Sequence, residues 1–183
     1  MNFNEYLTYF KDLLDNTTPV APYDDEEYQQ YTKLNWSRTN RWLKKADIDP
    51  GVQERFEQIN QPQEWIVITE PWCGDAAQCM PFIHLMAEMN PLITLRIVLR
   101  DQPPFLIEEY LTNGSKSIPK LIIRNAEGQD IGVWGPRPAP AQALFEKLQA
   151  ETEDFEVIKE TIQKWYNTDG GKTIQQEIVA LLA

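Results

Sequence analysis

Four short runs of apolar, mostly β-branched residues most constrain how this chain folds. The first, "WIVIT" at residues 65–69, stands between Pro62 and Pro71 and shows no alternation of polar and apolar side chains. That pattern is typical of a central strand that is buried on both faces. A second run, "LITLRIVL" at residues 92–99, predicts a neighbouring strand. The segment between them is long enough for the helix that a parallel crossover needs.

The last two runs predict a β-hairpin. "KLIIR" at residues 120–124 and "DIGVW" at residues 130–134 flank "NAEGQ", in which Gly128 suits a turn position with positive φ. Hairpin strands are antiparallel, whereas two strands joined by one helix form a right-handed parallel crossover. The order β-α-β-α-β-β-α therefore predicts an α/β fold, in which helices flank a mixed central sheet.

Helical periodicity fills most of the remaining chain. Apolar spacing, proline breaks and acid-first polarity predict helices at 2–15, 24–46, 49–60, 73–89, 104–111, 141–166 and 173–183. A length of 183 residues suffices for one domain with an apolar core. We therefore expect a single structural domain with an N-terminal helical extension (1–61), a core (62–150) and a C-terminal helical extension (151–183).

The charge balance argues against several function classes. The formal net charge is −11, which opposes nonspecific binding to nucleic acid or to an anionic membrane. The first residues include acids and no uninterrupted apolar stretch, so they predict neither a signal peptide nor a membrane span. A cytoplasmic location follows as the expectation, and there both cysteines would be thiols.

One segment departs from the acidic balance. Residues 28–46 contain no acid but five bases: Lys33, Arg38, Arg41, Lys44 and Lys45. Either they form a solvated helix face that balances "DDEE" just before it, or they form a local site for an anion or a partner. Trp36 and Trp42 lie among these bases, and we expect them to pack on the core rather than to bind single-stranded nucleic acid.

The stretch "TEPWCGDAAQCMPF" at residues 69–82 places both cysteines near the start of a predicted helix. Cys73 at that start would face free backbone N–H groups and the positive end of the helix dipole. Such a position lowers the pKa of a thiol, so we expect Cys73 to be an exposed, reactive nucleophile. Trp72 is expected to cover the sulfur, and Gly74 to keep side-chain bulk away. The charge of Asp75 acts in the opposite direction, raising the thiol pKa.

This junction and the motifs after it resemble the thioredoxin family. Pro81 stands where that family places a proline in the helix after its W-C-G motif. Ile118 and Pro119 in "SIPKLII" match the family's Ile-Pro before the third strand, and Gly135 matches the glycine after the hairpin. The ordered set spans residues 65–150. The whole chain is also similar to a poorly characterised bacterial group with a W-C-G-D-A monothiol motif and helical extensions at both ends.

The resemblance implies a thioredoxin fold with Pro119 in cis opposite Cys73, where the backbone would pair with an extended substrate. Two positions depart from the family. The second cysteine of its motif is Ala76 here, so the usual resolving thiol is missing. The buried acid of the preceding strand falls at Val67, which cannot relay a proton.

Three functions remain open. The leading one is monothiol thiol-disulfide exchange, an oxidoreductase activity in which Cys73 forms a mixed disulfide with a disulfide-bearing protein or a low-molecular-weight thiol, and an external thiol resolves it. The alternative is a non-catalytic binding or adaptor module that uses the groove near Pro119 and the basic helix 33–45. A minor alternative is a peroxidase-like protein that uses Cys73 and Cys79 as a pair.

Cys79 is expected to be a small buried apolar residue rather than a resolving thiol. Six residues along an intact helix rise by about 9 Å, whereas a disulfide needs Cα atoms within about 7 Å. No metal or cofactor is expected, because two cysteines and His84 lack the spacing of a zinc site and no phosphate-binding glycine loop is present. The sequence specifies no substrate, reductant or oligomeric state.

Overall fold

The molecule is built on one mixed sheet, seen in a computed structural model that describes residues 1–182. The strands follow the order β2-β1-β3-β4, with bounds β1 (Gln63–Thr69), β2 (Ile93–Leu99), β3 (Lys120–Arg124) and β4 (Asp130–Trp134). Strand β1 pairs in parallel with β2 and antiparallel with β3, which in turn pairs antiparallel with β4. The mixed α/β sheet expected from the sequence is therefore confirmed.

Strand β1 forms the centre of the core. Its residues Trp65, Ile66, Val67 and Ile68 have no exposed surface, which confirms the strand buried on both faces. Phe56 packs edge-on against the Trp65 ring, with ring centroids 5.7 Å apart. A run without polar alternation is stable at this position for two reasons. The neighbouring strands form hydrogen bonds with its backbone N–H and C=O groups, and helices or loops cover its side chains on both faces.

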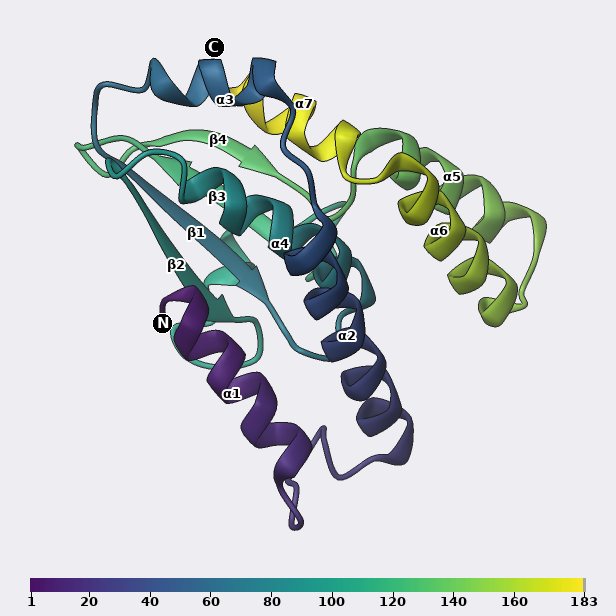
Figure 1. Cartoon of the computed structure of the whole chain (residues 1–183). Helices are drawn as coiled ribbons and strands as arrows, with labels where there is room; N and C mark the ends of the chain where they lie inside the picture. The colour runs from purple at the N-terminus through teal and green to yellow at the C-terminus, as the bar shows by residue number, and fades with distance from the viewer. Residues whose placement is uncertain (183) are drawn as a thin grey trace.

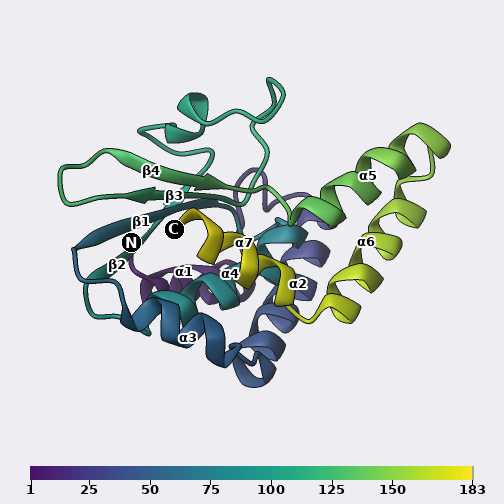
Figure 2. The same ribbon diagram turned by 90° about the horizontal axis from the view of Figure 1, so that it is seen from above.

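Seven α-helices and one short 3₁₀ helix complete the described chain (Figure 1). Their bounds are α1 (Phe3–Asp15), α2 (Glu26–Lys45), α3 (Pro50–Glu57), α4 (Gly74–Ala87), η1 (Leu106–Glu109), α5 (Ala139–Glu151), α6 (Phe155–Asp169) and α7 (Lys172–Leu181). Helix α4 connects the parallel strands β1 and β2. Seen from above, α5 and α6 project away from the sheet as a pair of neighbouring helices (Figure 2).

Two predicted helices differ from the structure. The single helix expected over 141–166 is wrong, because Thr152 is extended (φ −149°, ψ 146°) and separates α5 from α6. Asp154 then accepts hydrogen bonds from the backbone N–H groups of Glu156 and Val157, which starts α6 as a capped helix. The helix expected over 104–111 is reduced to η1.

The first helices pack on the core through aromatic side chains. Trp36 meets Phe10 with ring centroids 5.3 Å apart, and Trp42 meets Phe82 at 5.2 Å. Trp42 also donates its indole N–H to Gln78. Both tryptophans therefore pack as the sequence predicted, and helix α2 is fixed against α4, the helix that follows Cys73.

Gly135 meets a backbone constraint next to the Pro119 loop. Its φ is 112°, a region that residues with a side chain rarely adopt. A Cβ at this position would overlap the carbonyl oxygen of Pro119. Only glycine allows the end of β4 to approach the Pro119 backbone this closely.

We therefore expect Gly135→Ala to lower the free energy of unfolding by about 2–4 kcal/mol, since it combines backbone strain with a backbone clash. Urea denaturation at constant m-value measures the loss. Gly128→Ala is the matched control, because Gly128 also has positive φ (76°) but no atom lies within 4 Å of the place that a Cβ would take there. It should lose only about 1 kcal/mol. Equal losses in the two variants would show that the Pro119 contact contributes nothing.

Candidate functional site

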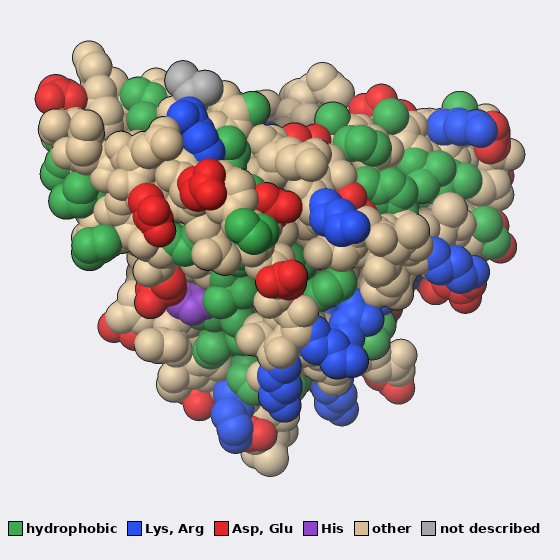
Figure 3. All heavy atoms as spheres, turned by 45° about the horizontal axis from the view of Figure 1, so that its top comes forward, with side chains coloured by type: hydrophobic (Ala, Val, Ile, Leu, Met, Phe, Trp, Pro, Cys, Tyr) green, Lys and Arg blue, Asp and Glu red, His purple; other side chains and the backbone are tan. Residues whose placement is uncertain are grey.

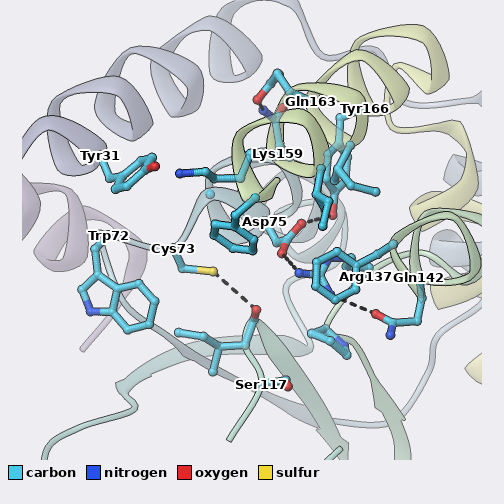
Figure 4. Close-up of a pocket in the computed structure, with 18 of the residues that line it drawn as sticks. Tyr31, Trp72, Cys73, Asp75, Ser117, Arg137, Gln142, Lys159, Gln163 and Tyr166 are labelled. Carbon is cyan, nitrogen blue, oxygen red and sulfur yellow. Dashed lines mark hydrogen bonds and ion pairs between the residues drawn. The ribbon is translucent and has the colours of Figure 1, made fainter. Parts of the chain in front are cut away.

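Cys73 stands at the junction between β1 and α4, where it serves as the helix N-cap. Its sulfur accepts a hydrogen bond from the backbone N–H of Ala76, with a sulfur–nitrogen distance of 3.4 Å. Its thiol donates to the carbonyl oxygen of Ile118, also at 3.4 Å (Figure 4). The Ile118–Pro119 bond is cis, as the resemblance implied. The sulfur of Cys73 therefore lies where the end of β1, the start of α4 and the loop with the cis-proline come together.

The sulfur lies at the base of a groove of about 1040 Å³. One wall comes from α2 and includes Tyr28, Leu34 and Arg38; another comes from the loop over residues 112–118. The C-terminal helices supply the rest, with Phe145 from α5 and Lys159 from α6. Both helical extensions therefore build the cavity around Cys73, although the cysteine itself is only 6% exposed.

Trp72 lines the same groove as Cys73, and its ring is held from both sides. Its ring meets Tyr28 edge-on at 5.6 Å between centroids, and the Arg100 guanidinium lies 4.6 Å from the ring centroid. Arg100 also forms an ion pair with Asp101, with 2.7 Å between Nη2 and Oδ2. The tryptophan wall is therefore fixed between the N-terminal helices and the loop after β2.

Asp75 is the centre of a buried polar cluster beside Cys73. Its Oδ2 lies 2.7 Å from the Nη2 of Arg137, and its Oδ1 accepts a hydrogen bond of 2.9 Å from the hydroxyl of Tyr166 (Figure 4). Arg137 precedes α5, and Tyr166 belongs to α6. The carboxylate thus joins the helix of the thiol to the C-terminal extension.

The pKa of the Cys73 thiol differs from the sequence-based expectation. Burial and the negative charge of Asp75 raise it to about 12, against the smaller lowering effects of the Ala76 N–H and Arg137. The expected exposed thiol with a lowered pKa is therefore wrong, because the groove walls remove water from the sulfur. Burial also raises the pKa of Asp75, while Arg137 and the Tyr166 hydroxyl lower it.

Cys79 lies on the far side of the same cluster. It is 1% exposed, and its sulfur is 3.7 Å from the hydroxyl of Tyr166. Burial raises the pKa of this thiol as well. Both cysteines are free thiols, and α4 runs without interruption from Gly74 past Cys79. Cys79 is therefore a buried core residue that touches the polar cluster through Tyr166.

The basic residues of α2 do not act as one surface. Only Arg38 lines the groove, whereas Arg41 lies over the Trp42 ring and donates to Asn167. Lys33, Lys44 and Lys45 are exposed outside the groove. Figure 3 shows Lys and Arg side chains gathered in the lower part of one face, with acidic side chains spread around them.

Four residues in or beside the groove escaped the sequence reasoning as functional candidates: Asn35, Lys159, Tyr166 and Arg137. Arg137 lies two residues after Gly135, one of the residues that carried the resemblance, so its position gave a usable signal. Tyr166 is 91 residues from Asp75 and no sequence spacing links the two. Among residues 1–182, no cluster of His, Cys, Asp or Glu has the arrangement of a metal site, and no helix is long and apolar enough to cross a membrane.

Comparison with known proteins agrees with this fold. A family model described as thioredoxin matches residues 21–167. The chain belongs to the thioredoxin family. A search of curated proteins found no match. Two solved structures share the fold over the whole chain: a protein of unknown function from Pseudomonas aeruginosa (15% identity, TM-score 0.59, 97% of that chain covered) and an HIV epitope scaffold (18% identity, TM-score 0.56, 98% covered).

The raised thiol pKa of this thioredoxin-family protein makes a direct prediction. The rate of Cys73 alkylation by iodoacetamide should keep rising with pH up to about pH 10, without the plateau of a low-pKa thiol. Asp75→Asn removes the negative charge and should shift the whole profile to lower pH, so that alkylation at pH 8 becomes faster. Peptide mass spectrometry measures Cys73 alone. A plateau near pH 7 in the unaltered protein would contradict the buried-thiol geometry.

Proposed function

We propose that this protein carries out monothiol thiol-disulfide exchange through Cys73. The observation that carries the proposal is the position of one sulfur, which caps α4, touches the Ile118 carbonyl beside a cis-proline and forms the base of a large groove. A cysteine with a merely structural role needs no cavity of about 1040 Å³ above it. Groups that bind a substrate converge there instead.

In the proposed reaction, the Cys73 thiol first loses its proton and its sulfur attacks one sulfur of a disulfide. A new S–S bond forms to Cys73, the substrate S–S bond breaks, and the second substrate sulfur leaves as a thiolate that takes up a proton. The thiolate of an external thiol then attacks the substrate-derived sulfur of the mixed disulfide and forms a new S–S bond with it. The bond to Cys73 breaks, and Cys73 leaves as a thiolate that takes up a proton. Ala76 stands where the family has its second cysteine, so this last step needs a separate molecule.

The raised pKa sets the speed of this reaction. Burial and the charge of Asp75 raise the pKa of Cys73 to about 12, so only a small fraction of the thiol is ionised at neutral pH. The thiolate that does form is more nucleophilic, but with a Brønsted slope below 1 this gain offsets only part of the loss. The net effect is an exchange rate below that of an ordinary exposed thiol. The reaction we propose is therefore slow unless the bound substrate favours the thiolate. A cytoplasmic setting with a thiol pool would supply the resolving reactant.

Incubation of the protein with a small disulfide should add one mixed-disulfide mass to Cys73, and a small thiol should remove it. Cys73→Ser should abolish the adduct, while serine keeps the helix cap. Cys79→Ala is the matched control and should retain the adduct, since Cys79 is buried away from the groove. Intact-mass spectrometry measures all three proteins. An adduct that survives in Cys73→Ser would exclude Cys73 as the exchanging thiol.

A second function, a binding or adaptor module, is favoured by two observations. Both helical extensions contribute walls to the groove, and the raised pKa of Cys73 keeps its thiol protonated at neutral pH. If binding is the function, a partner recovered from cell extract should remain bound to the Cys73→Ser variant. If exchange is the function, recovery should depend on Cys73 and be lost on reduction. The paired use of Cys73 and Cys79 as a peroxidase is not favoured, because α4 would have to unwind between them.

A further inference from the structure

One guanidinium at the groove is without an acidic partner among the described residues. Arg38 donates from Nη1 to the amide oxygen of Asn35, at 3.0 Å, and forms no salt bridge within residues 1–182. A guanidinium has five N–H donors, so most of its donors are left for a ligand. The half-buried setting of Arg38 strengthens any charge interaction it makes.

The other cations of the groove are already paired. Arg137 binds Asp75, Arg100 binds Asp101, and Lys116 binds Glu108. Lys159 pairs with Glu156 and lies over the Tyr31 ring, with 4.4 Å between Nζ and the ring centroid. Arg38 is thus the cation of the groove that a bound anion would meet without first displacing a carboxylate.

The position of Arg38 relative to the thiol is fixed by the chain itself. Its Nη1 lies 3.5 Å from the place that a Cβ would take on Gly74, the residue directly after Cys73. Asn35, which has no exposed surface, donates its side-chain N–H to the carbonyl oxygen of Pro71 at 3.1 Å. The same amide therefore holds both the loop before the thiol and the guanidinium above it.

From this arrangement we propose that the groove takes a small disulfide with an anionic group, such as a carboxylate, which Arg38 binds while Cys73 attacks the S–S bond. This inference rests on the proposed exchange function and names its substrate class. The substrate is small because Cys73 is only 6% exposed at the base of the groove, where a folded protein could not bring its disulfide without opening the walls.

The acidic surface of the molecule does not prevent this recognition. Charges separated by more than a Debye length, about 8 Å at physiological salt, are largely screened. The part of the net charge of −11 that lies outside the groove therefore acts weakly on a ligand inside it. Five acids line the groove itself (Glu27, Asp75, Glu146, Glu156 and Glu160), and three of these form ion pairs: Asp75 with Arg137, Glu156 with Lys159 and Glu160 with Lys164. Contact with a partly desolvated guanidinium is screened much less, and a carboxylate fits its fork with two hydrogen bonds.

Three symmetric disulfides of similar size and different charge test the proposal: dithiodiglycolate (anionic), bis(2-hydroxyethyl) disulfide (neutral) and cystamine (cationic). The rate of Cys73 adduct formation is measured for each with the unaltered protein and with Arg38→Gln. The comparison for one reagent between two proteins cancels the intrinsic reactivity of that reagent. We expect R38Q to lower the rate of adduct formation about tenfold with the anionic reagent and to change it less than about twofold with the neutral reagent. With the cationic reagent the rate should rise. The anionic effect should shrink at high salt.

Two further variants separate charge from structure. Arg38→Lys keeps the charge and should retain part of the anionic preference. Arg41→Gln is the matched control on the same helix, since Arg41 contacts Trp42 and Asn167 outside the groove, and it should leave all three rates unchanged. Thermal melting of each variant confirms that it is folded.

The possible results distinguish a failure of anion recognition by Arg38 from a failure of the proposed exchange function. If R38Q leaves the anionic rate unchanged, or slows all three reagents equally, Arg38 does not recognise an anion and the inference is overturned while exchange stands. If a folded acidic peptide with a disulfide reacts faster than dithiodiglycolate, the small-substrate class is overturned. If the unaltered protein forms no adduct with any reagent, the exchange function fails and this inference fails with it.

Discussion

The largely buried ion pair between Asp75 and Arg137 is the interaction on which the groove depends. Two charges removed from water are stable only if each is matched closely and hydrogen-bonded. Here Arg137 supplies the charge at 2.7 Å and the Tyr166 hydroxyl supplies a further hydrogen bond at 2.9 Å. Because these partners come from two different places in the C-terminal region, the pair fixes α6 and the chain before α5 against α4. The same carboxylate raises the thiol pKa. One residue thus couples the shape of the groove to the chemistry at its base.

The N-terminal extension contributes in a comparable way from the opposite side. The Asn35 amide connects the Pro71 carbonyl to Arg38, so helix α2 holds the loop that presents Cys73. In the middle of the molecule, Gly135 lets β4 approach the Pro119 backbone, which keeps the Ile118 carbonyl beside the sulfur. The core supplies the 112–118 loop, Arg137 and Phe145 to the groove, and the two extensions add the walls from α2 and α6. Together these walls remove water from the sulfur.

Much of the fold could be predicted from the sequence because strand burial and helix periodicity are local patterns. The "WIVIT" run and the Gly128 turn agree with the structure. The cis bond before Pro119 also agrees, and it was expected from the family resemblance rather than from a local pattern. The break between α5 and α6 was missed because Thr152 and Asp154 resemble ordinary polar helix residues until the capping geometry is known. The functional site was harder to predict from the sequence. Its cysteine and flanking residues are contiguous in sequence, whereas Arg38 and Tyr166 reach it from helices that no motif connects to it.

The error about the Cys73 pKa follows from the same limitation. A helix start favours the thiolate through nearby N–H groups, and this effect can be anticipated from a short sequence motif. Desolvation depends on every wall around the sulfur, and those walls come from residues far away in the sequence, such as Tyr31 and Tyr166. At Cys73 the nonlocal effect is the larger one. In this chain, groove walls built by distant parts of the sequence therefore determine whether a thiol at the helix start is a fast nucleophile or a protonated group that a bound substrate has to activate.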